Sequence, residues 1–101
     1  MSSAEPVAVI KPVVDLQEPP LFKVVYLNDN QTTVDFVIET LISFFSYNLD
    51  TAMTITNDIH ERGSAVVAVL PFEVAEQKGI EVTVAARNNN FPLQVQVEPD
   101  I

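Results

Sequence analysis

The chain has 101 residues, enough for one domain with a single hydrophobic core, and it carries a formal net charge of −9. The acidic balance and the lack of any basic run argue against nucleic-acid binding, and the lack of cysteine excludes disulfides, thiolate metal sites and thiol catalysis. No apolar run approaches the roughly 20 residues of a membrane span, and no secretory signal is visible. We therefore expect a cytoplasmic protein that binds neither membranes nor nucleic acid.

Residues 1–20 differ in composition from the rest of the chain. They hold four of the seven prolines, no aromatic residue and no sustained apolar periodicity. Such a segment cannot bury enough apolar surface to offset the entropy of ordering it. We expect a mobile N-terminal extension over 1–20 and one folded domain over 21–101.

The first elements of the domain follow from propensity and spacing. Residues 21–27 are rich in strand formers and predict a strand, and the polar residues 28–31 predict a loop. A helix is expected to start at Thr32, because Thr32 and Asp35 have the spacing of a capping box. Apolar side chains at helical spacing carry this helix to Phe45.

A second helix and a second strand come next. Residues 46–48 break the first helix, with Asn48 as the expected N-cap of the second, which ends at Gly63 in the position where a positive φ is favoured. Residues 65–70 form a continuous apolar run, which predicts a buried central strand.

The last third of the chain predicts a third helix and a third strand. Pro71 suits a helix start, and residues 72–87 are expected to be helical, although Gly79 and a short alternating stretch argue against it. Residues 93–97 alternate with period two and predict a half-exposed strand. The order β-α-α-β-α-β predicts an α+β fold of two layers, with three strands in one sheet and the helices on one face.

The residue inventory favours binding over catalysis. There is one histidine and no Gly-rich phosphate loop, and no metal-ligand spacing or pair of carboxylates placed for acid–base work is found. A small enzyme using His60 as a base would lack a partner nucleophile. We expect no enzymatic activity, no cofactor and no metal.

Two places nevertheless stand out as candidate sites. Residues 28–30 are two asparagines and an aspartate after the first strand, which ordinary turn chemistry would explain. His60 lies near the end of the second helix, where a histidinium would interact favourably with the helix dipole. However, Thr56, Ile59 and His60 share one helical face, and a polar group beside an apolar wall is typical of a ligand site.

Several motifs in order resemble a known family. Leu27–Val37 (LNDNQTTVDFV) resembles the signature Leu-Asn-Asp-Asp-x-Thr-Pro-Met-Glu-Phe-Val of ClpS, the bacterial N-degron adaptor. Phe44–Tyr47 resembles its Phe-Phe segment, and Ile59–Gly63 its Val-His-x-x-Gly. Phe72–Lys78 is similar to Ala-Glu-Val-Ala-Glu-Thr-Lys, and Asn90–Leu93 to Glu-His-Pro-Leu. The blocks keep one register without gaps.

The resemblance implies a fold and a function. The fold would be three antiparallel strands with three helices. The function would be to bind the free α-amino group and bulky hydrophobic first residue (Leu, Phe, Tyr or Trp) of N-degron substrates. The adaptor would deliver them to an AAA+ unfoldase, ClpA or ClpC, for degradation by ClpP. We expect a monomer.

The resemblance also implies site residues. The α-amino group would be bound by Asn28, Asp29 and His60. The unfoldase would be contacted by Glu73 and Lys78, whose alternative interpretation is exposed helix charge. The first side chain would enter a pocket whose residues are apolar or small and polar: Asn30, Thr32, Val34, Val37, Thr56, Ile59 and Leu93.

Four departures from the family pattern bear on specificity. Asn30 replaces an acidic residue, Thr33 a proline, and Val34 and Thr56 each replace a methionine. We expect a wider and more polar pocket with altered side-chain preference. The departures also leave open a docking or inhibitory domain on the unfoldase that has lost N-degron capture.

Overall fold

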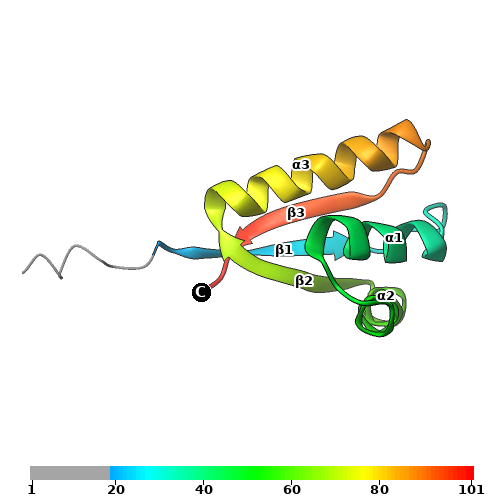
Figure 1. The fold of residues 1–101 in the computed structure, drawn as a ribbon, viewed down its shortest axis with the longest axis horizontal. Coiled ribbons are helices and arrows are strands. Elements are labelled where there is room, and N and C mark those ends of the chain that lie inside the picture. The colour runs from blue at the N-terminus through cyan, green and yellow to red at the C-terminus, as the bar shows by residue number, and fades with distance from the viewer. Residues whose placement is uncertain (1–18) are drawn as a thin grey trace, which may run out of the picture.

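The computed structural model describes residues 19–101, so the expectation of a mobile extension falls almost wholly on residues outside the described part. Six elements follow one another in the predicted order (Figure 1). Their bounds are β1 Leu21–Leu27, α1 Val34–Phe45, α2 Leu49–Arg62, β2 Ser64–Pro71, α3 Phe72–Asn88 and β3 Gln94–Pro99.

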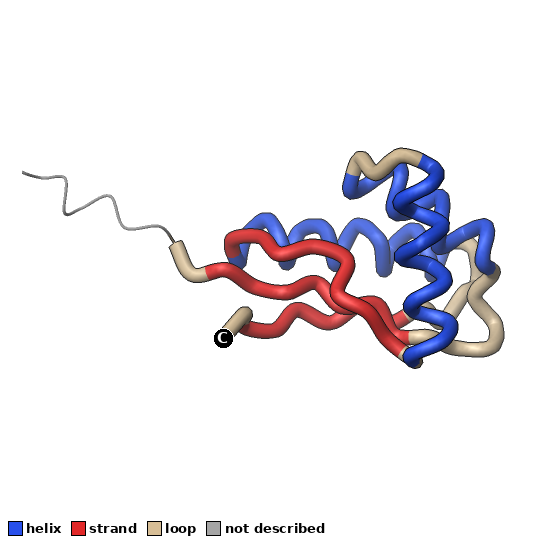
Figure 2. Tube along the Cα trace, turned by 90° about the horizontal axis from the view of Figure 1, so that it is seen from below, coloured by secondary structure: helices blue, strands red, loops and turns tan. Residues whose placement is uncertain are grey.

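The three strands form one antiparallel sheet in the order β2-β1-β3. In Figure 2, α3 runs along the strands and α2 runs across them at one end of the sheet. The predicted α+β fold is confirmed. The prediction that residues 65–70 form the central strand is wrong, because β1 lies in the centre and β2 at an edge. Val66 and Val69 on the outer face of β2 remain 46% and 42% exposed.

A β-bulge interrupts the residue alternation of β2. Val24 lies opposite Ala68 and Val25 opposite Val66, which leaves Val67 as an extra residue. Val67 is 1% exposed and belongs to the core. The bulge thus breaks the inward–outward alternation that an edge strand with one covered face would otherwise show.

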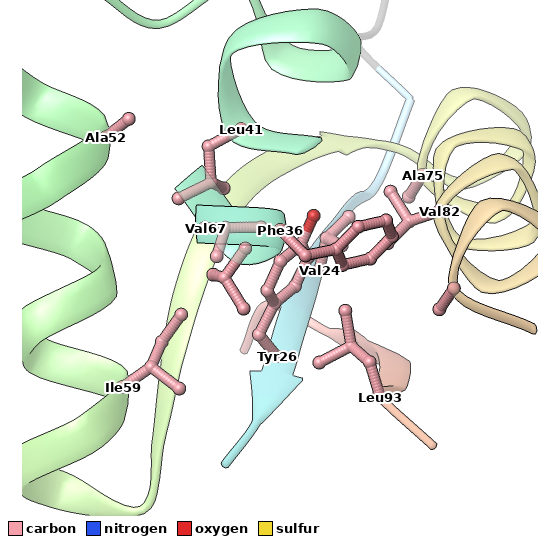
Figure 3. Close-up of a cluster of buried hydrophobic side chains, with 12 residues drawn as sticks. Val24, Tyr26, Phe36, Leu41, Ala52, Ile59, Val67, Ala75, Val82 and Leu93 are labelled. Atoms are coloured by element: carbon pink, nitrogen blue, oxygen red, sulfur yellow. The ribbon is translucent and has the colours of Figure 1, made fainter. Parts of the chain in front are cut away.

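The core lies between the inner face of the sheet and all three helices. Val24 and Tyr26 of β1 are fully buried and meet Leu41 of α1 (Figure 3). The phenol of Tyr26 also makes a buried hydrogen bond of 2.7 Å with the Thr40 hydroxyl. The Thr40 proton is donated to the Val37 carbonyl, so Tyr26 is the donor in this pair. The bond fixes α1 over the central strand.

The helix boundaries confirm two predicted caps and correct a third. Asn48 caps α2 by accepting a 2.8 Å hydrogen bond from the Thr51 N–H, and Gly63 ends α2 with a φ of 89°. The capping box from Thr32 is wrong, because α1 begins one residue later. Thr33 is the N-cap and accepts from the Phe36 N–H, and Phe36 has no side chain that could return a bond.

The third helix is confirmed over its predicted range despite Gly79. This glycine is buried against β3, and an added Cβ would lie 3.6 Å from Val97 and 3.7 Å from Val95, which is ordinary contact. Pro71 ends β2 and is the N-cap of α3.

The two glycines should respond oppositely to substitution by alanine. Gly79→Ala should raise the free energy of unfolding by roughly 0.5–1 kcal/mol, since it removes the helix penalty of glycine without a clash. Gly63→Ala should lower it by about 1–2 kcal/mol, because a side chain at a φ of 89° is strained although space is open around it. Urea unfolding of both variants measures the difference, and equal signs would contradict this account of α2 termination.

Candidate binding site

A cavity of about 310 Å³ lies where the loop after β1 meets α1 and α2. Its lining comprises residues from these three segments: Asn28, Asp29, Asn30, Thr32, Val34, Val37, Thr56, Ile59 and His60. The structure therefore brings together every residue proposed for the amino group and all but one proposed for the pocket.

One backbone hydrogen bond joins the two sides of this cavity. The Asn28 N–H, directly after β1, donates to the Gly63 carbonyl at 2.8 Å. The Gly63 N–H donates in turn to the Ile59 carbonyl at 2.9 Å, which ends α2. Because His60 lies in this last turn of α2, the bond sets the loop after β1 beside it.

Asp29 holds the loop in shape. Its Oδ1 accepts from the backbone N–H groups of Gln31 (2.8 Å) and Thr32 (2.6 Å), and its Oδ2 accepts from the Thr32 hydroxyl (2.8 Å). Burial acts to raise the pKa of the Asp29 carboxyl, but these hydrogen bonds and the charge of Arg87 outweigh it and lower that pKa below its usual 3.8. Asp29 therefore places a fixed negative charge at the cavity.

Asn28 and His60 offer polar atoms that the fold does not use. Both residues are exposed, and within residues 19–101 neither the Asn28 side-chain amide nor the His60 ring hydrogen-bonds to another group of the protein. An amide oxygen and a neutral imidazole nitrogen are both acceptors. With the Asp29 carboxylate, they form an acceptor-rich rim suited to a small cation with several N–H donors.

The remaining wall is mostly apolar. Val37 and Ile59 are 7% and 3% exposed and form the deep part, whereas Val34 is 54% exposed and lies at the mouth. Thr56 is also buried, and its hydroxyl donates to the Ala52 carbonyl one turn earlier at 2.7 Å. The polar group of Thr56 is thus satisfied within its own helix and needs no partner in the cavity.

Three predicted site residues lie elsewhere. Leu93 is 1% exposed and packs in the core (Figure 3), and it does not line the cavity. Glu73 is exposed in the first turn of α3. Lys78, further along α3, pairs with Glu81 at 3.7 Å. Neither Glu73 nor Lys78 lines the cavity.

Sequence reasoning missed Arg87. Its guanidinium donates to the carbonyls of Phe91 and Leu93, each at 2.9 Å, and so fixes the turn between α3 and β3. Its charge also helps lower the pKa of Asp29. Asp29 and Arg87 are 58 positions apart, and no sequence pattern links them, so only the fold reveals the effect of Arg87 on the pKa of Asp29.

The part of the chain that the structure describes lacks two other kinds of feature. Residues 19–101 include no group of three or more His, Asp or Glu side chains that could hold a metal ion. No helix over the same range is both long and apolar enough to cross a membrane.

Comparisons with known proteins agree on one family. Residues 17–96 match the family described as "ATP-dependent Clp protease adaptor protein ClpS". An adapter protein ClpS from Campylobacter jejuni is 44% identical over 85 residues, which cover 84% of this chain and 88% of that protein. One from Treponema denticola is 42% identical over 81 residues, 80% of each chain.

A solved structure is similar as well. Agrobacterium tumefaciens ClpS2 bound to L-phenylalaninamide superimposes with a TM-score of 0.80 at 37% identity. The match covers 82% of this chain and all of that one.

Substitution of Asp29 should reveal its role in holding the loop. Asp29→Asn should lower the free energy of unfolding at neutral pH by about 1 kcal/mol, since a neutral amide replaces charge-assisted bonds. The folded pKa is depressed, so this stabilisation is present above pH 3.8 and is lost as the pH falls through the lower folded value. Urea unfolding from pH 7 to pH 3 should show the two proteins converging. Asp100→Asn, at an exposed position, is the control and should show little loss at any pH.

Proposed function

This chain belongs to the ClpS family of adaptors of the ATP-dependent Clp protease, and on that basis we propose that it recognises N-degrons. It binds the free α-amino group and bulky hydrophobic first residue of substrates, namely Leu, Phe, Tyr or Trp. It delivers them to a ClpA- or ClpC-type unfoldase for degradation by ClpP. The observation that carries the proposal is a single cavity with an acceptor-rich rim and an apolar interior.

The rim suits an ammonium group. An α-ammonium has three N–H donors and no acceptor, so it needs acceptors that converge on it. Asn28 supplies an amide oxygen, His60 a ring nitrogen, and Asp29 the opposite charge. Charge-assisted hydrogen bonds of this kind are each worth roughly 1.5–3 kcal/mol. Because the Asp29 carboxylate already accepts three hydrogen bonds from its own loop, its contribution is mainly electrostatic.

The interior suits one large apolar side chain. Val37 and Ile59 form its buried wall, and burying a Leu or Phe side chain contributes about 1.5–3 kcal/mol. The two contributions together give an affinity on the order of micromolar. The ligand of the ClpS2 homologue supports a polar rim for the amino group and an apolar interior for the side chain, because L-phenylalaninamide has both a free α-amino group and an aromatic side chain.

Delivery would use another face of the molecule. We place contacts with the unfoldase at Glu73 and Lys78 on α3, neither of which lines the cavity. A substrate could then be held while the adaptor is docked. The protein would act as a monomer in the cytoplasm, and as an adaptor it brings substrates to a protease without being one.

Blocking the amino group should weaken recognition at least roughly tenfold. A fluorescent peptide beginning with Phe should bind with micromolar Kd, and its N-acetylated form should bind at least roughly tenfold more weakly, since it loses the charge and most donors. His60→Ala should weaken binding of the unblocked peptide by about tenfold. Thr54→Ala, on the exposed side of α2, is the control.

Equal affinity for the two peptides, measured by fluorescence anisotropy, would favour the alternative. The chain would then be a docking or inhibitory domain on the unfoldase that has lost N-degron capture.

The preference of the protein for particular first residues should depend on Val34 at the mouth of the cavity. Val34 is shorter than the methionine of the family pattern, so we expect the first-residue preference to extend beyond Leu, Phe, Tyr and Trp. Peptides beginning with Ile or Val should bind nearly as well as one beginning with Leu. Val34→Met should reduce affinity for the β-branched peptides by roughly tenfold and leave Phe little changed. Titration of peptides that differ only at residue one tests this. Rejection of Ile and Val by the unsubstituted protein would contradict the relaxed preference.

A further inference from the structure

A second hollow of about 370 Å³ opens beside the cavity described above. It lies between α1 and α2, and its lining comprises residues of these two helices: Val34, Ile38, Met53, Thr56, Asn57 and His60. Three of them, Val34, Thr56 and His60, also line the first cavity. The two hollows therefore have a common wall.

The spacing of the lining residues makes this hollow a groove between two helix faces. Val34 and Ile38 are one turn apart on α1, and Met53, Thr56 and His60 recur at helical spacing on α2. Val34 and Met53 are 54% and 50% exposed. Large apolar side chains that line one hollow together, and are not scattered singly over a surface, mark a site of interaction.

We infer that the groove is a second subsite, which receives an apolar side chain at the third position of the bound substrate. The inference rests on the proposed function, because it needs the substrate's first side chain in the first cavity. In an extended chain the side chains of residues 1 and 3 point to the same side, about 6.5 Å apart, whereas that of residue 2 points away. A hollow that shares a wall with the first cavity is placed for residue 3.

The chemistry of the groove defines the side chain it takes. Met53 and Ile38 offer apolar surface, and methionine adapts to irregular shapes, so Leu, Met or Phe would fit. Asn57 and His60 contribute the polar part of the lining. The substrate preference would then extend beyond the first residue.

Peptides that move one leucine test the subsite. Phe-Gly-Leu, Phe-Leu-Gly and Phe-Gly-Gly, each followed by the same Gly-Ser-Lys tail carrying a fluorophore, are titrated with the full chain. Leu at position 3 should raise affinity by roughly three- to tenfold over Gly, as expected for burying about half of its side chain. Leu at position 2 should have little effect.

Variants assign the gain to the groove. Met53→Ala should remove most of the advantage of Leu at position 3 and leave Phe-Gly-Gly unchanged. Leu49→Ala is the matched control, because Leu49 lies one turn earlier on α2, is 55% exposed and does not line either hollow. Thermal unfolding of both variants checks that the fold is kept.

The titrations have several outcomes that would overturn the subsite for residue 3. No gain from Leu at position 3, a gain at position 2 instead, or a loss with Met53→Ala that is equal for all peptides would overturn the subsite. A further peptide, Trp-Gly-Gly with the same tail, is titrated as well. If Met53→Ala weakens binding of this peptide alone, the subsite is overturned and the groove is an extension of the first cavity. Failure of the proposed function looks different, since Phe-Gly-Gly would then bind no better than its acetylated form.

Discussion

The hydrogen bond from the Asn28 N–H to the Gly63 carbonyl is the constraint on which the site depends. It joins the end of the central strand to the end of α2, two points far apart in the sequence. Gly63 adopts a φ of 89°, which turns the chain directly after Arg62, the last residue of α2. The rim of acceptors therefore arises from the way a helix ends, and the apolar wall arises from the helix faces that precede it.

Asp29 has the turn chemistry that the sequence suggested, and the same bonds bear on the role we propose for it at the α-amino group. As ordinary turn chemistry, its carboxylate accepts two backbone N–H groups and the Thr32 hydroxyl. Those same bonds, together with Arg87, keep it ionised beside the Asn28 amide and the His60 ring. The residue that organises the loop thus also supplies a negative electrostatic potential there.

The fold was largely predictable because periodicity and caps are local signals. Asn48 and Gly63 marked the ends of α2 correctly, and α3 formed despite Gly79 because its buried face packs on β3. The errors were non-local. The central position of β1 depends on strand pairing, and the apolar run of β2 contains a bulge residue, Val67, that no local pattern reveals. For the candidate site, family resemblance named the cavity lining, but that Leu93 lies in the core and that Arg87 acts on Asp29 depend on tertiary packing.

The bonds within the loop after β1 have a consequence for how a ligand would be met. Residues 28–32 are tied to one another and to α2 by protein groups alone, so the entropy of ordering the mouth is lost during folding and not during association. A loop ordered in this way would not adapt its shape to the ligand. It would therefore select N-terminal residues by size and charge, and a poorly matched one would bind weakly.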